Sequence, residues 1–369
     1  MRLERTGSRG VQPVPSPPPR MRIVRATLHP YRLPLVGPLR LAFGTLTARE
    51  GVLLRLEDDA GRVGWGEAAP LPGFSPDTLE AATRVLRAFA DDPNAYDRDD
   101  AGLHAAPHSP AARAAIDGAR LDLDAQRARL TMARVLAPSA AATVYVNALL
   151  TGDPPAVLAR ADAARADGYR AAKLKVGQRS PDEDAALVRA VSACLGPAVA
   201  LRLDANRAWS YADAVRFARG VAGVPLAYVE EPLAGPARLA EFARETGLPV
   251  ALDESLAALA PSDLAAHGYA AAVVLKPLVL GGVRRCLRWA EAARTDGLVP
   301  VVSAAFESGV GLRHALALAA ALGETPAGLD TYRYLAADVL APRLPLGGPS
   351  VDVADALALR EVLAGPALA

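Results

Sequence analysis

The sequence predicts an α/β protein whose larger part is a barrel of parallel strands surrounded by helices. From residue 144 onward, short apolar strand candidates recur with starts 22 to 29 residues apart, and Ala-, Arg- and Glu-rich helical stretches separate them. The strand candidates are too apolar to alternate cleanly, which is typical of parallel strands covered by helices. Eight β–α units of this size suit a (β/α)8 barrel. A doubly wound open sheet is the alternative, but no glycine-rich nucleotide-binding motif follows the first strand.

Residues 21–130 predict a smaller α+β domain ahead of the barrel. Strand-like runs flank a turn signal, Asp58-Asp59-Ala60-Gly61, which is typical of a β-meander. Amphipathic, Ala-rich stretches follow and predict helices. We expect strands at residues 21–28, 52–57 and 63–68, and helices at residues 76–90 and 109–130.

The barrel elements can be placed in order along the rest of the chain. Strands are expected to alternate with helical stretches, as successive β–α units require. We expect strands at residues 144–148, 171–176, 200–205, 227–230, 250–253, 272–276, 299–303 and, more weakly, 328–331. We expect helices at residues 155–167, 181–194, 211–220 and 283–295.

Charge and composition argue against several classes of partner. Lys plus Arg is 41 and Asp plus Glu is 40, so the net charge is +1, which argues against a protein that binds nucleic acid through a basic face. The chain has no uninterrupted apolar stretch of about 18–20 residues to span a membrane. Residues 1–20 are Arg-, Pro- and Ser-rich, lack the apolar core of a secretory signal and predict a disordered leader. We therefore expect a cytoplasmic location and no nucleic-acid or membrane partner.

Charged residues lie inside or at the C-terminal ends of five consecutive predicted barrel strands. Alternate residues of a strand share a face, so Lys173 and Lys175 should point the same way. By the same rule Arg202, Asp204 and Asn206 share one face. Catalytic groups of such barrels cluster at the C-terminal mouth, so these strands should present their side chains to one cavity. In chain order the candidates are Lys173, Lys175, Asp204, Glu230, Asp253 and Lys276.

The three carboxylates in this series predict a divalent cation. Asp204, Glu230 and Asp253 would lie close together and raise each other's pKa unless a cation is present. Hard carboxylate oxygens suit Mg²⁺, and Mn²⁺ is the other ion that we expect to fit. The alternative is that each carboxylate only caps the helix that follows it. Glu231 should face away from the cavity. Glu254 is expected to contact the metal ligands without binding the metal itself.

The lysines predict acid–base chemistry. A lysine inside a strand is costly to bury unless it is paired or functional. Lys173 and Lys175 lie beside each other, and like-charged neighbours depress a lysine pKa, so that one of them can act as a neutral base at about pH 7–8. Lys276 should stand on the opposite side of the cavity. With a divalent cation, this set suits removal of a proton α to a carboxylate, and the alternative is a structural ion-pair network.

Five short motifs occur in order: KLKVG, LDANRAW, VEEP, LDES and VVLKP. In sequence and spacing they resemble the enolase superfamily of the muconate-lactonizing type, in which a Lys or His base acts with Mg²⁺. Within it the chain is most similar to the o-succinylbenzoate synthase family. Residues 66–75, 203–209 and 303–308 carry this narrower resemblance, which covers about residues 21–340.

The resemblance implies a (β/α)7β barrel of the TIM type, capped by an α+β domain built from the N-terminal segment and the C-terminal tail. The cap would comprise residues 21–130, and the barrel would comprise residues 131–325. The tail, residues 326–369, would complete both domains. The implied reaction is a metal-dependent syn-dehydration of 2-succinyl-6-hydroxy-2,4-cyclohexadiene-1-carboxylate to 2-succinylbenzoate in menaquinone biosynthesis, through an enediolate.

The same resemblance implies a role for each candidate residue. Lys175 would remove the α-proton and, as the conjugate acid, help the hydroxyl leave as water. Lys276 would stay an ammonium that faces the enediolate, while Lys173 would support the substrate carboxylate and lower the pKa of Lys175. The metal ligands would be Asp204, Glu230 and Asp253. The substrate is expected to contact Ser303, Asn206, Phe74 and Arg202, beneath loops at residues 37–46 and 70–75.

Other activities stay open, because proton abstraction is common to all of them. Relatives with the same lysines racemise N-succinyl amino acids, epimerise dipeptides or cycloisomerise muconates. Family motifs around Ser303 often carry more hydroxyls than Ala304 and Ala305 provide, which leaves the contacts to the substrate carboxylates open. Outside enzymes, the alternative is a non-catalytic barrel that serves as a scaffold. The sequence does not give the oligomeric state or the preference between Mg²⁺ and Mn²⁺.

Overall fold

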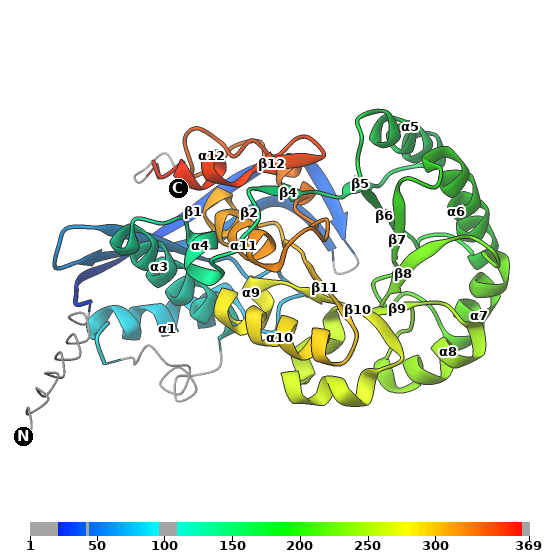
Figure 1. Cartoon of the computed structure of the whole chain (residues 1–369), viewed down its shortest axis with the longest axis horizontal. Helices are drawn as coiled ribbons and strands as arrows, with labels where there is room; N and C mark the ends of the chain where they lie inside the picture. Colours follow the sequence, from blue (N-terminus) through cyan, green and yellow to red (C-terminus); the bar gives the residue numbers. More distant parts are fainter. Residues whose placement is uncertain (1–20, 42–43, 96–108, 364–369) are drawn as a thin grey trace, which may run out of the picture.

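The computed structural model describes residues 21–41, 44–95 and 109–363 of the chain (Figure 1). The expected leader at residues 1–20 and part of the expected loop at residues 37–46 lie outside the described residues. The described chain forms an N-terminal sheet with helices, a barrel, and a C-terminal segment that contacts both.

Three strands, β1 (Ile23–Leu41), β2 (Gly44–Asp58) and β3 (Val63–Ala68), form the antiparallel β-meander that the sequence predicts. β1 and β2 are much longer than predicted and pair along most of their length as one hairpin. A register shift between Pro34 and Leu39 marks an irregularity in this hairpin, of the kind that bends a strand.

Two helices, α1 (Leu79–Asp91) and α3 (Pro110–Ala128), pack against this sheet, and the five elements together are called the cap below. Ser109 caps the N-terminus of α3 by accepting a hydrogen bond from a backbone N–H. α3 lies directly on β3 because Gly64 and Gly66 carry no side chain. A Cβ atom at either position would collide with backbone carbonyls of α3.

Seven parallel strands form the barrel sheet, and their order in the sheet is their order in the chain. Parallel strands joined in this way need crossover connections, which here run over the outside of the barrel (Figure 1). The strands are β5 (Ala148–Leu150), β6 (Ala171–Lys175), β7 (Ala200–Asp204), β8 (Leu226–Glu230), β9 (Val250–Leu252), β10 (Ala270–Leu275) and β11 (Val299–Val302). The main helices are α5 (Pro154–Ala166), α6 (Pro181–Leu195), α7 (Tyr211–Gly220), α8 (Leu239–Thr246), α10 (Val283–Thr295) and α11 (Gly309–Leu322). Short helices are α4 (Met132–Leu136), η1 (Pro236–Arg238), η2 (Glu254–Ala258), η3 (Pro261–His267), α9 (Pro277–Leu280) and η4 (Asp330–Tyr334).

The first predicted barrel strand, at residues 144–148, is wrong in its position. Its first part, β4 (Thr143–Tyr145), lies outside the barrel sheet and pairs antiparallel with the C-terminal strand β12 (Ser350–Asp352). The barrel strand β5 begins only at Ala148. Residues 144–150 are interrupted by the polar Asn147, but one polar residue does not distinguish a passage between two sheets from a single strand with a side chain that faces a cavity.

The eighth predicted strand, at residues 328–331, is reduced to one pair of residues. Ala327 bridges Val146, and Gly328 bridges Ser303, both in parallel orientation. Backbone hydrogen bonds accompany both bridges, so the pair joins the two edges of the sheet. The barrel is therefore closed in the (β/α)7β arrangement, by residues that precede the short helix η4.

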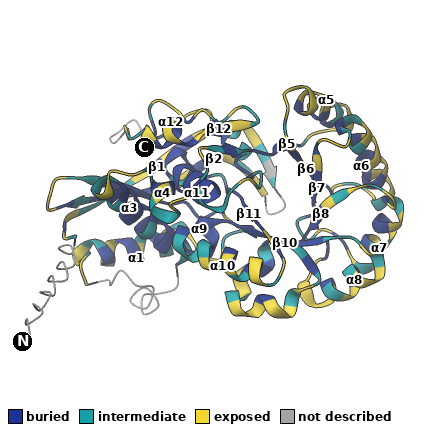
Figure 2. Ribbon diagram, in the orientation of Figure 1, coloured by how far each residue is buried: buried dark blue, intermediate teal, exposed yellow. Residues whose placement is uncertain are grey.

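The apolar core runs from the cap through the outer layer of the barrel, and Figure 2 shows the barrel strands and α11 as largely buried. Alternate residues of the strands face the barrel interior instead, because neighbours along a strand point to opposite sides. These interior residues form a separate small cluster of Tyr228, Ala251, Ala272, Val274 and Val301. No helix within the described ranges is both long enough and apolar enough to cross a membrane.

The C-terminal segment contacts both the barrel and the cap. Its last helix, α12 (Val353–Ala358), packs against α11 of the barrel. Leu335, just beyond the barrel, bridges Leu35 of β1 in the cap. Through these contacts the end of the chain helps to hold the long hairpin against the barrel.

His314 makes the stability of the protein pH-dependent. Its ring is buried where α11 packs on α3, against Gly118. Burial, and after it the charge of Arg313, lowers the pKa of His314 to about 4. The unfolded chain takes up this proton near pH 6.5 and the folded chain does not, so stability is complete above about pH 6.5 and falls as the pH drops towards 4.

Urea unfolding of the wild type and of His314→Gln tests this. Between pH 7 and pH 5 the free energy of unfolding should fall by about 2 kcal/mol more in the wild type than in the variant. An equal fall in the two proteins would contradict the prediction.

Candidate active site

A cavity of about 570 Å³ opens at the C-terminal ends of the barrel strands. The cap lines it with apolar side chains, among them Leu71 and Phe74, and the barrel lines it with lysines and other polar side chains. A larger hollow of about 690 Å³ is lined mainly by apolar residues that follow β7, β8 and β9. None of the predicted lysines and metal ligands, all of which lie in the described ranges, lines that hollow. The chemistry therefore belongs to the smaller cavity.

Two lysines of β6 meet one carboxylate of β7. Lys173 and Lys175 alternate along β6, and Asp204 is paired with Lys175 in the register of the two strands. Lys173 Nζ donates to Asp204 Oδ2 at 2.9 Å, and Lys175 Nζ donates to the same oxygen at 2.6 Å. Burial alone would raise the pKa of Asp204, but the two ammonium groups outweigh burial and hold that pKa below its usual range. Asp204 thus stays charged between the two lysines.

Lys173 also joins Asp204 to the next carboxylate around the barrel. Its Nζ lies 3.3 Å from Glu230 Oε2, and Glu230 is paired with Asp204 across β7 and β8. Burial, and after it the charge of Asp204, raises the pKa of Glu230 to about 8. Burial alone would lower the pKa of Lys173, but the two carboxylates raise it well above its usual range. The sequence predicts that a like-charged neighbour lowers a lysine pKa. At Lys173 the two carboxylates have the larger effect, and the pKa is raised.

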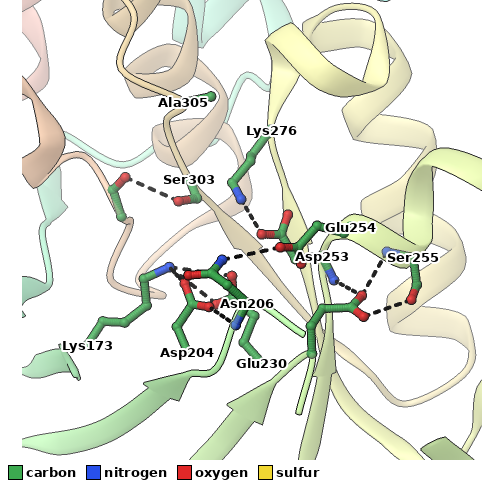
Figure 3. A network of polar contacts seen from close by, with 12 residues as sticks. Lys173, Asp204, Asn206, Glu230, Asp253, Glu254, Ser255, Lys276, Ser303 and Ala305 are labelled. Atoms are coloured by element: carbon green, nitrogen blue, oxygen red, sulfur yellow. Dashed lines mark hydrogen bonds and ion pairs between the residues drawn. The ribbon is translucent and has the colours of Figure 1, made fainter. Parts of the chain in front are cut away.

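Lys276 stands on the far side of the carboxylates from Lys173 (Figure 3). Its buried ammonium donates to Asp253 Oδ2, and the centre of the Phe74 ring lies 4.4 Å from Nζ. Burial alone would lower the pKa of Lys276, but the charges of Asp253 and Glu230 outweigh burial and raise it. The cap and the barrel together thus favour a charged ammonium at this position.

Asn206 and Glu254 hold the end of Lys175. Asn206 Oδ1 accepts a hydrogen bond from Lys175 Nζ at 2.6 Å. Figure 3 shows the second bond of this amide, from Asn206 Nδ2 to Glu254 Oε1 at 3.2 Å. Glu254 Oε2 is buried and has no hydrogen-bond partner among the described residues. Both side chains line the cavity, so the free end of Lys175 has a fixed position within it.

Glu231 holds the loop that carries Asp253. Its carboxylate accepts hydrogen bonds from the backbone N–H groups of Asp253 at 2.9 Å and Ser255 at 2.7 Å. It also accepts one from Arg207 Nε at 3.1 Å, and Arg207 lines the cavity. Arg207 is not among the site residues predicted from the sequence, although its position directly after Asn206 was a signal for it.

The structure places three of the four predicted substrate contacts at the cavity. Ser303, Asn206 and Phe74 line the cavity, whereas Arg202 is not among the described residues that line it. The guanidinium of Arg202 donates to Asn147 Oδ1 at 3.2 Å and to a backbone carbonyl. Asn147 does line the cavity, so Arg202 can act on a substrate through it.

Asn147 and Thr331 are cavity residues that the sequence analysis missed. Thr331 Oγ1 is buried without a hydrogen-bond partner among the described residues. Both lie in predicted strands, at residues 144–148 and 328–331, but neither side chain carries the charge by which the other candidates were recognised.

The predicted metal ligands are buried, and each bonds a lysine. As the side chains stand, no three His, Cys, Asp or Glu residues in the described part of the chain lie close enough together to hold a metal ion. Asp204 and Glu230 bond Lys173, and Asp253 bonds Lys276. The donor set nevertheless fits a divalent cation: three buried carboxylates stand at the ends of neighbouring strands, and burial with the charge of Asp204 raises the pKa of Glu230 to about 8, so added positive charge beside Glu230 would be favourable.

Fold and site together define a class of enzyme. Carboxylates stand at the C-terminal ends of three successive barrel strands, lysines stand on both sides of them, and a separate domain covers the cavity. This arrangement suits abstraction of a proton next to a carboxylate.

Comparisons with known proteins agree with this class. The family model described as enolase C-terminal domain-like matches residues 156–357, and the one described as MenC, N-terminal domain, matches residues 23–111. An o-succinylbenzoate synthase from Yersinia pseudotuberculosis is 35% identical over 324 residues, which cover 86% of this chain and 93% of the relative. One from Vibrio cholerae is 35% identical over 332 residues, which cover 86% and 92%. The chain belongs to the enolase superfamily and, within it, to the o-succinylbenzoate synthase family.

Solved structures share the fold over nearly the whole chain. A dipeptide epimerase from Enterococcus faecalis, complexed with Mg and the dipeptide L-Leu-L-Tyr, has a TM-score of 0.80 and 26% identity, and the match covers 94% of this chain and 99% of that one. An enolase superfamily member from Roseovarius nubinhibens, complexed with magnesium, has a TM-score of 0.79 and 27% identity, with coverage of 88% and 90%. The predicted fold class, a TIM-type barrel with an N-terminal capping domain, is confirmed.

Proposed function

We propose that this chain dehydrates 2-succinyl-6-hydroxy-2,4-cyclohexadiene-1-carboxylate to 2-succinylbenzoate, as an enzyme of the hydro-lyase class. The observation that carries the proposal is the match, along most of the chain, to relatives named for this reaction. The N-terminal model, which covers the cap, points the same way. The epimerase resemblance rests on a shared fold at lower sequence identity, so it supports the alternative activity less well.

In this proposal Asp204, Glu230 and Asp253 hold one divalent cation. Mg²⁺ is the proposed ion, with Mn²⁺ as the alternative, and the magnesium complexes of two structural relatives support the choice. When bound, the cation offsets the negative charge that develops on the substrate carboxylate.

Lys175 is the proposed base and acid. Asp204 Oδ2 and Asn206 Oδ1, each 2.6 Å from Nζ, aim its end into the cavity. As a neutral amine Lys175 takes the α-proton, and as an ammonium it returns that proton to the β-hydroxyl. The C–H and C–O bonds break on one face of the ring, a double bond forms between the two carbons, and water leaves. One side chain thus serves both proton transfers of a syn-dehydration.

The remaining residues hold charge and exclude water. Lys276, on the far side of the carboxylates, places its ammonium against the enediolate. Lys173 keeps Asp204 and Glu230 in place and supports the substrate carboxylate. Phe74 of the cap covers Lys276, so water is kept from that side of the cavity.

The two lysines should differ in their tolerance of arginine, because arginine keeps its charge but stays protonated. Lys175→Arg should be inactive, since the base must be neutral at the start. Lys276→Arg should keep measurable dehydration, reduced by the misfit of the larger group. The measurement is turnover of the cyclohexadiene substrate by both variants.

The same variants separate this function from racemisation of N-succinyl amino acids, which needs proton transfer on both faces of the substrate. Both arginine variants should then fail to racemise N-succinyl amino acids, assayed in D₂O. A wild type that acts only on the succinyl amino acid, with both variants inactive, would replace the synthase proposal by the racemase.

A further inference from the structure

A buried carboxylate of the cap lies at the start of a barrel helix. Glu67, in the motif at residues 66–75 that the sequence analysis singled out, accepts hydrogen bonds from Ser308 N at 2.9 Å and Gly311 N at 2.7 Å. It also accepts bonds from the hydroxyl groups of Ser308 and Tyr31, both at 2.5 Å. Glu67 thus caps the N-terminus of α11 from another domain.

A buried arginine of β2 makes a second link between the domains. The guanidinium of Arg49 donates to Phe306 O at 3.0 Å, in the barrel, and to Pro70 O at 3.3 Å and Ala69 O, in the cap. A planar guanidinium with several fixed donors suits such a junction, because it sets the relative position of the carbonyls that it binds.

These links hold the two walls of the cavity. Leu71, Gly73 and Phe74, which follow the carbonyls bound by Arg49, line the cavity from the cap. Residues 303–306, which precede the helix capped by Glu67, line it from the barrel. In the described chain neither Arg49 nor Glu67 has a hydrogen bond or ion pair to the lysines and carboxylates of the site.

The barrel wall needs such support. Phe306 has a φ of 63°, a left-handed conformation that a bulky residue adopts only when its surroundings hold it there. The space around the cap carboxylate is also closely filled, because a Cβ at Gly311 would lie 2.9 Å from Glu67 Oε2 and 2.7 Å from Glu307 Cβ. Loss of a Glu67 contact therefore has little room to be absorbed without moving the segment before α11.

We propose that Glu67 and Arg49 are positioning residues that set the distance between the cap wall and the barrel wall, and through it the affinity for the carboxylate substrate. The proposal rests on the proposed function only for the choice of substrate. Since the lysines and their carboxylates are not touched, weakening either link should raise KM and leave kcat nearly unchanged.

Glu67→Gln tests the proposal, with Asp122→Asn as the matched control. Glutamine keeps the shape of glutamate, but its NH₂ group would face N–H or O–H groups that donate hydrogen bonds to Glu67. Asp122 is also a buried carboxylate that joins the cap to α11, through Arg313 at 3.7 Å, but it does not line the cavity. We expect KM to rise about 10- to 100-fold in Glu67→Gln with kcat within about threefold of the wild type, and KM to stay unchanged in Asp122→Asn.

The measurement is steady-state kinetics with whichever carboxylate substrate the wild type turns over, together with the thermal midpoint of each variant. The wild-type assay alone decides the proposed function, and the ratio of variant to wild type decides the positioning role. A lowered midpoint with unchanged KM in Glu67→Gln would overturn the proposal, as would an equal rise of KM in Asp122→Asn. Should Glu67→Gln not fold, Arg49→Lys gives the same readout, because lysine keeps the charge but lacks the three separate nitrogens with which the guanidinium reaches the three carbonyls. An unchanged KM there would overturn the proposal.

Discussion

Lys175→Ala is expected to lower turnover by about 10⁴-fold or more, because one side chain performs both proton transfers. Removal of a general base alone typically costs about 10²–10⁴-fold, and loss of the acid that expels water adds to it. Neither Asp204 nor Asn206, the hydrogen-bond partners of Lys175, can replace it, since a carboxylate that still bonds the Lys173 ammonium is a weak base and an amide is none. Steady-state turnover of the cyclohexadiene substrate measures the loss.

The fold should survive this change. The side chain of Lys175 is partly exposed, and Asp204 keeps its bond to Lys173 when Lys175 is removed. Lys173→Ala is the matched comparison: it takes a buried ammonium from two buried carboxylates, so it should lower the thermal midpoint as well as turnover. A Lys175→Ala protein that keeps about a third of the wild-type rate would place the base elsewhere, with Lys173 the first candidate.

Most of the barrel could be predicted because its signals are local. An apolar run that ends in a charged residue marks β6, β7 and β8, and their bounds differ little from those predicted. The prediction fails at residues 143–150, where one largely apolar segment contributes to two sheets, and at the closing strand, which is reduced to Ala327 and Gly328. In both places the outcome depends on contacts with residues far away in the chain, which a local pattern does not contain.

The site shows the same division between local and distant contacts. Strand alternation alone places Lys173 and Lys175 on one face, and the structure brings both to Asp204. Strand alternation does not predict that both ammonium groups donate to the same oxygen, Asp204 Oδ2. These two ammonium groups lower the pKa of Asp204. The links through Glu67 and Arg49 could not be predicted from the sequence either, because each joins residues about 240 to 260 positions apart.

Removal of divalent cations should abolish turnover, and Mg²⁺ or Mn²⁺ should restore it. Three buried carboxylates face three lysines, yet burial and Asp204 still raise the pKa of Glu230 to about 8. The lysines thus leave the charge of Glu230 incompletely compensated, and an enediolate would add further negative charge to the same cavity. Full turnover in exhaustively chelated protein would remove the metal from the proposal.

Asp204→Asn should show which side chains the cation needs. The variant loses one of three charged donors, so turnover should fall by about 10³-fold or more, equivalent to several kcal/mol of transition-state stabilisation. A readout independent of activity is the thermal midpoint of chelated protein, which added Mg²⁺ should raise in the wild type by mass action and leave unchanged in the variant. Asp122→Asn, with its altered carboxylate outside the cavity, should respond to Mg²⁺ as the wild type does. A response in Asp204→Asn equal to that of the wild type would mean that the cation binds elsewhere and that the carboxylates serve only to hold the lysines.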